Sequence, residues 1–272
     1  MANLVLKRIT GRTKIWFIIG DPSAHIVATA LFNQYYFDND IDASVSALNV
    51  VHADLPTFIQ AIRSFRNVCG FGVTLPHKIE ICRYLDHLSQ RARQIGAVNF
   101  VRRDPDGSLS GDMVDGIGMT KALILNGVAI QGARVLQVGA GGVGRAIAFA
   151  IADAGACELT IANRSLARAE NLAQAVQASY PACLCRVGEA VAPTGIDLVV
   201  NATSVGMQEG DPLPIDITAI NGTTAVAEVI MSPETTALLD LADEKGCTTV
   251  RGKEMLIQQL HLASVHLGLQ PQ

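Results

Sequence analysis

Residues 139–144 carry glycines at the spacing G-x-G-x-x-G. The loop follows the apolar sequence VLQV and opens the helical sequence RAIAFAIADAG, which is the context that a dinucleotide-binding loop requires. The first glycine permits a tight turn, the second lets a pyrophosphate approach the backbone, and the third lets the helix pack close to the sheet. The positive end of the helix dipole then favours the phosphates. A glycine-rich turn without a ligand is the alternative. The six residues are Gly139, Ala140, Gly141, Gly142, Val143 and Gly144.

The segment after the next strand indicates which dinucleotide is bound. Asn163, Arg164 and Ser165 follow that strand, and Arg168 lies one helical turn further on. Two guanidinium groups and a hydroxyl group suit the 2′-phosphate of NADP. Glu158 lies at the start of the strand, which is the wrong end of the sheet for binding a ribose. The segment favours NADP. NAD stays an alternative because Asn163 could bond unphosphorylated hydroxyls, and a solvated helix start is the plain alternative to both.

Lys78 and Asp115 are candidates for the proton transfer that accompanies hydride transfer. A hydride moved to or from a nicotinamide needs a partner that moves a proton on the substrate oxygen. Lys78 follows Pro76, where a strand ends, and Asp115 lies at the junction of two α/β segments. Such a pair can exchange a proton with an alcohol near neutral pH. For each residue taken alone, an ordinary surface charge is the alternative.

The first third of the chain alternates short apolar strands with helical segments. This alternation predicts an α/β unit with a mixed or parallel sheet. Asp54 is a candidate N-cap, with Pro56 in the first turn of its helix. The expected strands are 14–20, 43–50, 70–75, 97–103 and 108–111, and the expected helices are 23–40, 54–65 and 79–96.

The remainder of the chain has a second set of apolar strands and helices, which begins with the strand, glycine loop and helix of residues 133–156. We expect further strands at 158–165, 196–207, 224–230 and 247–252, and helices at 166–179, 234–246 and 252–272. The fold class is therefore α/β with two domains. Residues 1–112 form a substrate domain onto which the helix 252–272 packs back, and residues 113–251 form a doubly wound Rossmann domain for NAD(P). We expect the active site in the cleft between the two domains.

Composition excludes several other classes of protein. The 272 residues are 49% apolar and 17% charged, which predicts a substantial core rather than disorder. A net charge of −4 argues against a nucleic-acid partner. We see no apolar run long enough for a membrane span and no signal peptide, so we expect a cytoplasmic protein. The scattered cysteines and histidines lack the spacing of metal ligands, so we expect no metal site.

Eight segments resemble, in order, the motifs of the shikimate dehydrogenase family over nearly the whole chain. The segment VTLPHK resembles the family's V-T-x-P-x-K, and GDMVDGIG resembles its G-x-N-T-D-x-x-G. The eight segments are GDPSAH (20–25), VTLPHK (73–78), GAVN (96–99), GDMVDGIG (111–118), GAGGVGRA (139–146), NRSLARA (163–169), NATSVGM (201–207) and GKEMLIQQ (252–259).

The resemblance implies a role for individual residues. Lys78 is implied as the catalytic lysine with Asp115 as its partner, and Thr74, Asn99 and Gln259 as substrate contacts. The reaction implied is reversible NAD(P)-dependent oxidation of a ring hydroxyl in a shikimate- or quinate-like hydroxy acid, carried out by a monomer or homodimer. Besides the glycine loop and the basic segment, the implied cofactor contacts are Asn201, Ala202, Thr203, Ser204, Met207, Gly252 and Met255.

Several positions depart from the family pattern at the substrate site. Ile26 and Ala28 replace the two serines that hold the carboxylate of shikimate, Gly72 replaces an asparagine, and Met231 replaces a tyrosine. The family's Asn-Thr before the catalytic aspartate is Met113-Val114 here. Each missing hydrogen-bond partner costs about 1–3 kcal/mol of substrate binding. We therefore expect an altered substrate, such as a ring without the carboxylate, and we keep a catalytically weak nicotinamide-binding sensor as the alternative.

Overall fold

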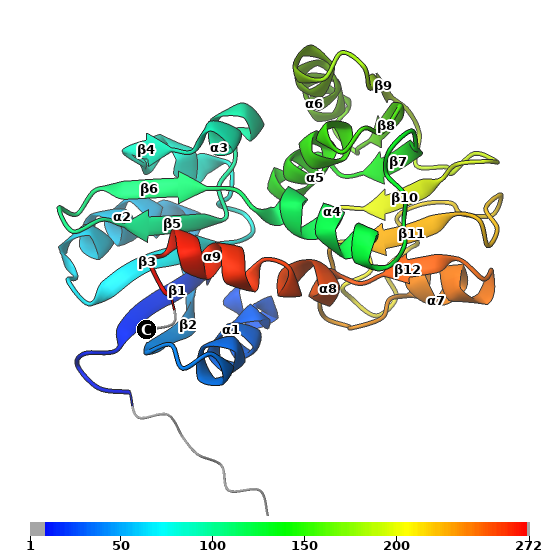
Figure 1. The fold of residues 1–272 in the computed structure, drawn as a ribbon. Helices are drawn as coiled ribbons and strands as arrows, with labels where there is room; N and C mark the ends of the chain where they lie inside the picture. Colours follow the sequence, from blue (N-terminus) through cyan, green and yellow to red (C-terminus); the bar gives the residue numbers. More distant parts are fainter. Residues whose placement is uncertain (1–8, 271–272) are drawn as a thin grey trace, which may run out of the picture. The chain divides into compact units, whose positions relative to one another are not determined.

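The computed structural model describes residues 9–270, which form two compact units (Figure 1). The first unit comprises the described residues up to Met113 together with those from Leu260 onward, and the second runs from Val114 to Gln259. Each unit contains its own six-stranded sheet. The chain therefore passes between the units twice, after Met113 and after Gln259.

The first unit is built on a mixed sheet with the strand order β2-β1-β3-β5-β6-β4. β1 pairs in parallel with β2 and β3, whereas β5 pairs antiparallel with β3 and β6. Because β1, β2 and β3 are parallel, the residues that follow them lie along one edge of the sheet. The strands are β1 (Lys14–Gly20), β2 (Ala43–Asn49), β3 (Val68–Val73), β4 (His87–Leu88), β5 (Phe100–Arg103) and β6 (Leu109–Asp112).

Helices cover both faces of this first sheet. On one face Trp16 of β1 packs edge-on against Phe32 of α1, with ring centroids 4.8 Å apart, and Tyr35 of α1 also reaches His261 of α9. On the other face Phe71 of β3 packs against Phe58 of α2 at 5.1 Å. The helices of the unit are α1 (Ala28–Asp38), α2 (Leu55–Ser64), α3 (Gln90–Ile95) and α9 (Leu260–His266).

The second unit is a doubly wound sheet in which every strand pair is parallel. Its order is β12-β11-β10-β7-β8-β9, so the chain reverses direction across the sheet between β7 and β10. A parallel sheet covered on both faces needs mainly apolar strands, and β10 and β11 are wholly buried and apolar up to their last residues, Asn201 and Glu228. The strands are β7 (Arg134–Val138), β8 (Glu158–Ala162), β9 (Leu184–Val187), β10 (Leu198–Asn201), β11 (Ala225–Glu228) and β12 (Thr248–Val250).

The helices of the second unit pack closely against the sheet and one another. A Cβ atom on Gly118 of α4 would lie 2.7 Å from Cγ of Gln259, so the residues after α8 can pack there only because position 118 is glycine. On the opposite face of the sheet, Leu136, Val199 and Val226 form a core with Leu238 of α7. The helices are α4 (Asp115–Leu125), α5 (Gly142–Asp153), α6 (Leu166–Ser179), α7 (Ala237–Glu244) and α8 (Gly252–Ile257).

The structure confirms the α/β fold class and corrects the helix expected over residues 79–96. This segment is a 3-10 turn at Glu80–Tyr84, then β4, then α3. Long-range pairing overrides the helical periodicity, because Asp86 N donates to Leu109 O and Ser89 N donates to Gly111 O. Ser89 then caps α3 by accepting from Ala92 N at 3.1 Å.

Two further features differ from the sequence-based expectations. The helix expected over 252–272 is interrupted between α8 and α9, where Gln259 N donates to Leu256 O, and the two helices belong to different units. Asp54 occupies the N-cap position of α2, but its side chain makes no capping hydrogen bond. None of the helices between residues 9 and 270 is both long enough and apolar enough to span a membrane.

Candidate active site

Lys78 lies just beyond the carboxyl end of β3, in the first unit, and only 8% of its surface is exposed. A turn holds it there, because His77 N donates to Thr74 O at 3.0 Å. The imidazole of His77 is fully buried, with Nε2 2.6 Å from Val50 O, and this contact anchors the turn to the residue after β2. The ammonium group is therefore carried on a fixed backbone.

Asn99 is placed beside Lys78 by backbone pairing. Val98 N donates to Lys78 O at 2.8 Å, and Val73 N donates to Asn99 O at 2.8 Å. Asn99 N in turn donates to Asp112 O at the end of β6. The structure thus brings Thr74, Lys78 and Asn99 together at one edge of the first sheet.

A buried carboxylate fixes the end of β6, next to the point where the chain leaves this unit. Asp112 accepts hydrogen bonds from Ser89 Oγ, from Met113 N and from the guanidinium group of Arg91. Burial alone would raise the pKa of Asp112, but the hydrogen bonds from Arg91 and Ser89 outweigh it and hold the pKa below its usual range. Motif spacing gave no signal for this ion pair, whose partners are 21 residues apart.

The positions that depart from the family pattern are apolar, and all of them except the half-buried Met231 are buried. Ile26 and Ala28 are buried, and a Cβ on Gly20 would lie 3.4 Å from Ile26 Cδ1 and 2.6 Å from Thr74 Cγ2. Ile26 and Thr74 therefore both border Gly20. A Cβ on Gly72 would lie 3.2 Å from the ring of Trp16, so the indole occupies the space that a longer side chain would need.

The glycine loop of the second unit has the geometry of a pyrophosphate cradle. Gly139 has φ = 111°, a conformation that favours glycine, and a Cβ on Gly144 would lie 2.2 Å from Gly139 O. By contrast, a Cβ on Gly141 would meet nothing within 4 Å, so open space faces the backbone there. Gly142 and Val143 begin α5, whose first N–H groups and dipole favour an anion. These residues fit a dinucleotide.

Gln137 shapes this loop and is a residue that the sequence reasoning missed. Its fully buried side chain donates from Nε2 to Gly139 O at 2.9 Å and to Gly144 O at 2.8 Å. The amide therefore ties both ends of the glycine loop to β7. The only indication of this role in the sequence is that Gln137 is the single polar residue within the apolar stretch VLQV.

The residues of the basic segment after β8, 163–168, have two different roles. Asn163 Oδ1 accepts from Ala140 N at 3.1 Å and Asn163 Nδ2 donates to Ser165 O at 2.9 Å, so this side chain braces the glycine loop. Arg164, Ser165 and Arg168 are exposed, and no ion pair engages either arginine within residues 9–270. Their side chains are thus accessible to a 2′-phosphate.

Asp115 and Gln259 lie in the second unit, together with the glycine loop. Asp115 is buried in the first turn of α4. Gln259 is buried after α8, against Gly118 of α4. Met255 and Gly252 lie in α8 itself, and a Cβ on Gly252 would lie 2.3 Å from Ile230 O. Gln259 therefore belongs with α4 and α8 rather than with the first unit.

The segment 201–207 leaves the carboxyl end of β10 in a compact turn. Asn201 Oδ1 accepts from both the N–H and the hydroxyl of Thr203, and Asn201 Nδ2 donates to Val205 O. Ala202 N donates to Val138 O, which links the turn to the end of β7. Ser204 O accepts from Met207 N at 3.2 Å. No group of three or more His, Cys, Asp or Glu in the described part of the chain could hold a metal ion.

A Rossmann sheet with a pyrophosphate cradle, linked to an α/β unit with a buried lysine, defines a nicotinamide-dependent oxidoreductase. The family profile "Shikimate dehydrogenase substrate binding domain" matches residues 18–101, and "Shikimate / quinate 5-dehydrogenase" matches residues 122–207. Shikimate dehydrogenase (NADP(+)) from Bacillus cereus is 33% identical over 92% of this chain and 91% of its own length.

Two solved structures are similar over nearly the full length. Ligand-free 5-ketofructose reductase of Gluconobacter sp. strain CHM43 is 31% identical, with a TM-score of 0.84 over 97% of this chain and 96% of its own. Shikimate 5-dehydrogenase from Listeria monocytogenes, in complex with shikimate and NAD, is 30% identical, with a TM-score of 0.84 over 98% and 95% of the two chains.

The chain belongs to the shikimate dehydrogenase family. It is an NADP-dependent oxidoreductase that acts on a CH–OH group, and NAD is a further cofactor within the family. The expected family, enzyme class and cofactors are thereby confirmed.

Proposed function

We propose that the protein catalyses reversible hydride transfer between NADP(H) and a hydroxyl or ketone group on a polyhydroxylated ring. The observation that carries this proposal is the buried Lys78, locked beside Asn99 by the hydrogen bonds Val98 N to Lys78 O and Val73 N to Asn99 O. A positioned ammonium group of this kind is suited to proton transfer on a substrate oxygen. When bound, the nicotinamide supplies the hydride chemistry.

Each remaining side chain has a role in this proposal. Lys78 moves the hydroxyl proton, Asp115 is its partner in the family's catalytic pair, and Asn99, Gln259 and Thr74 bind substrate oxygens. The glycine loop binds the pyrophosphate, while Arg164, Ser165 and Arg168 bind the 2′-phosphate. Removing either guanidinium group should therefore weaken NADPH more than NADH. Segment 201–207 with Gly252 and Met255 forms the nicotinamide side. A cytoplasmic location and a monomeric or homodimeric state stay predictions from the sequence.

Replacement of Lys78 by alanine tests the catalytic assignment. We expect kcat to fall by about 10²–10⁴-fold because the proton-transfer group is lost. The dissociation constant for NADPH should stay within about twofold, since Lys78 lies in the first unit and the glycine loop in the second. Steady-state kinetics and fluorescence titration measure the two quantities. Unchanged turnover by the variant would remove Lys78 from the mechanism.

The substrate itself has two candidates. The curated relative and the Listeria structure favour a shikimate- or quinate-like acid. The similarity to 5-ketofructose reductase, together with the buried apolar side chains Ile26 and Ala28, favours a ring or keto-sugar without a carboxylate. An uncompensated carboxylate beside these two side chains would be costly to desolvate. Steady-state assays with shikimate, quinate and 5-ketofructose separate the two candidates.

The double variant Ile26→Ser with Ala28→Ser tests the cause of that preference. Two added hydroxyl donors should raise kcat/KM for shikimate relative to 5-ketofructose by about 10-fold or more, at about 1 kcal/mol or more per hydrogen bond. The matched control is Ile26→Val with Ala28→Gly, which changes volume without adding donors. An equal ratio in both double variants would contradict the role of these positions. Tight NADPH binding without turnover of any ring alcohol would instead indicate a sensor.

A further inference from the structure

We propose that Glu228 is a positioning residue of the cofactor-binding half, whose carboxyl group fixes the two segments that follow β10 and β11. This inference rests on the proposed assignment of residues 201–207 to the cofactor site. Glu228 is the last residue of β11 and lies opposite Asn201, the last residue of β10, in the parallel register. Ligands of doubly wound sheets bind beyond the carboxyl ends of the strands, which is the edge where both side chains lie.

The Glu228 side chain holds the segment that leads from β11 to α7. Its exposed fraction is 0%, and Oε2 accepts a hydrogen bond from the hydroxyl of Thr236 at 2.9 Å. Thr236 is itself the N-cap of α7, where its hydroxyl oxygen accepts from Leu239 N at 3.4 Å. One carboxyl group therefore anchors both residues 229–236 and the start of α7.

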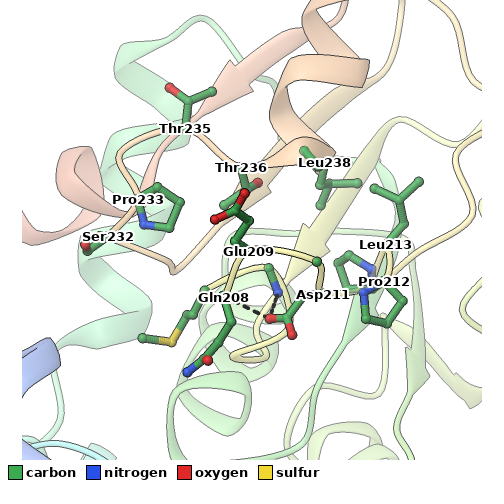
Figure 2. A pocket seen from close by; sticks show the side chains of 15 residues that line it. Gln208, Glu209, Asp211, Pro212, Leu213, Ser232, Pro233, Thr235, Thr236 and Leu238 are labelled. Atoms are coloured by element: carbon green, nitrogen blue, oxygen red, sulfur yellow. Dashed lines mark hydrogen bonds between the residues drawn. The ribbon is translucent and has the colours of Figure 1, made fainter.

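The same carboxyl group acts on the segment after β10 through packing. A Cβ added to Gly206 would lie 3.4 Å from Ile230 Cδ1 and 3.7 Å from Thr236 Cβ, so the two segments lie next to each other with room for little more than a methyl group between them. Together they line a pocket of about 540 Å³. Figure 2 shows Ser232, Pro233 and Thr236 from one segment and Gln208, Glu209 and Asp211 from the other around it. A shift of Thr236 would therefore change the wall of the pocket that Met207 also lines.

A carboxyl group is costly at this position. Its second oxygen, Oε1, is buried and has no hydrogen-bond partner among the residues the structure describes. Burial raises the pKa of Glu228 to about 7, against the hydrogen bonds from Thr236 and Asn201. An isolated carboxylate in such surroundings is unfavourable unless it is neutralised or the site rearranges.

The other charges near Glu228 do not neutralise it. Asp240 of α7 raises its pKa further through charge repulsion. Arg251, which follows β12, forms its ion pairs with other acids, Asp243 at 3.9 Å and Glu254 at 3.9 Å. Below pH 7 the carboxyl group is therefore neutral and compatible with the packed segments. Above pH 7 its ionisation favours a rearrangement of the Thr236 segment and weaker cofactor binding.

The test is NADPH affinity between pH 5.5 and 8.5, measured by fluorescence titration of the full chain. The wild-type dissociation constant should rise by about tenfold from pH 6 to pH 8.5. Glu228→Gln keeps an acceptor for Thr236 and cannot ionise, so its affinity should lack the transition near pH 7. Glu228→Ala should bind more weakly at every pH. The titration of the 2′-phosphate of NADPH is common to all variants and cancels in the comparison.

Thr236 provides a matched pair of variants. Thr236→Ser keeps the hydroxyl and should keep the wild-type pH profile, whereas Thr236→Val removes the hydrogen bond that lowers the Glu228 pKa and should move the transition to higher pH. A wild-type profile in Glu228→Gln, or identical profiles for the two Thr236 variants, would overturn the positioning role. Failure of the wild-type protein to bind any nicotinamide cofactor at pH 6 would instead overturn the proposed function.

Discussion

Single buried polar side chains fix the positions of the backbone segments around the candidate site. Gln137 ties the glycine loop to β7, Asp112 fixes the end of β6, and His77 anchors the turn that carries Lys78. Each makes at least one hydrogen bond to the backbone or to a residue far away in sequence. The cost of burying such a group is recovered as a fixed position for its neighbours.

Glu228 should make the stability of the protein depend on pH. Its pKa is raised from 4.5 in the unfolded chain to about 7 in the folded protein, so the folded state retains a proton that the unfolded state loses. The resulting loss in the free energy of unfolding is absent below pH 4.5, grows as the pH rises, and levels off above pH 7 at about 3 kcal/mol.

Glu228→Gln lacks this titration and provides the comparison. The free energy of unfolding is measured by urea denaturation. The difference between the variant and the wild type should increase in favour of the variant from pH 4.5 to pH 7 and stay constant above pH 7. A constant difference across this range would show that Glu228 is not a buried titrating group.

At the scale of elements, strand pairing and helix packing decide which helices and strands the sequence pattern predicts correctly. The stretch Leu166–Ser179 forms α6 as expected, because Ala169, Leu172 and Val176 recur at helical spacing and are buried. The helical pattern over 79–96 fails because Asp86 and Ser89 are drawn into pairing with β6. β9 lies at the edge of its sheet and has an exposed Leu184, so its sequence carries little strand signal. Local periodicity cannot report such long-range partners.

Gly72→Asn should destabilise the first unit rather than restore a substrate contact. Its Cβ would lie 3.2 Å from both Trp16 and Ile18, and the added amide would be enclosed among aromatic rings. Overpacking and an unsatisfied buried amide together should cost about 2–4 kcal/mol. Thermal unfolding monitored by tryptophan fluorescence measures this directly, since Trp16 is the only tryptophan in the chain. A Tm equal to that of the wild type would show that the indole can move aside.

At the scale of the whole molecule, the sequence was sufficient for the class of fold and for the cofactor loop. These follow from spacing within short segments, such as the glycines of 139–144. The roles of Asn163, Gln137 and Glu228 could not be predicted from the sequence, because each side chain acts through a hydrogen bond to another segment. The sequence also does not indicate that Gln259 belongs to the second unit, since neither glycine nor proline marks the interruption between α8 and α9.

Ligands should protect the two units separately in hydrogen exchange. NADPH alone should slow exchange in residues 134–146 and 163–169, since its stabilisation of about 2.7 kcal/mol at 100 times the dissociation constant acts on the second unit. Residues 74–78 and 96–99 should gain protection only when substrate is added. Exchange measured by mass spectrometry with each ligand alone and with both provides the controls. Equal protection of residues 74–78 by NADPH alone would contradict this division of roles.

The double passage of the chain between units has a consequence for biosynthesis. The first unit needs α9, whose His266 Nε2 lies 3.0 Å from Ser110 O and whose His261 contacts Tyr35. A ribosome makes α9 only after all of residues 114–259, so the second unit can fold while the first still lacks a helix. Until then one face of the first sheet, including the aromatic rings around Trp16, is incompletely covered. Nascent chains released before residue 260 should therefore be clients for chaperones, although the segment containing Lys78 has already been made.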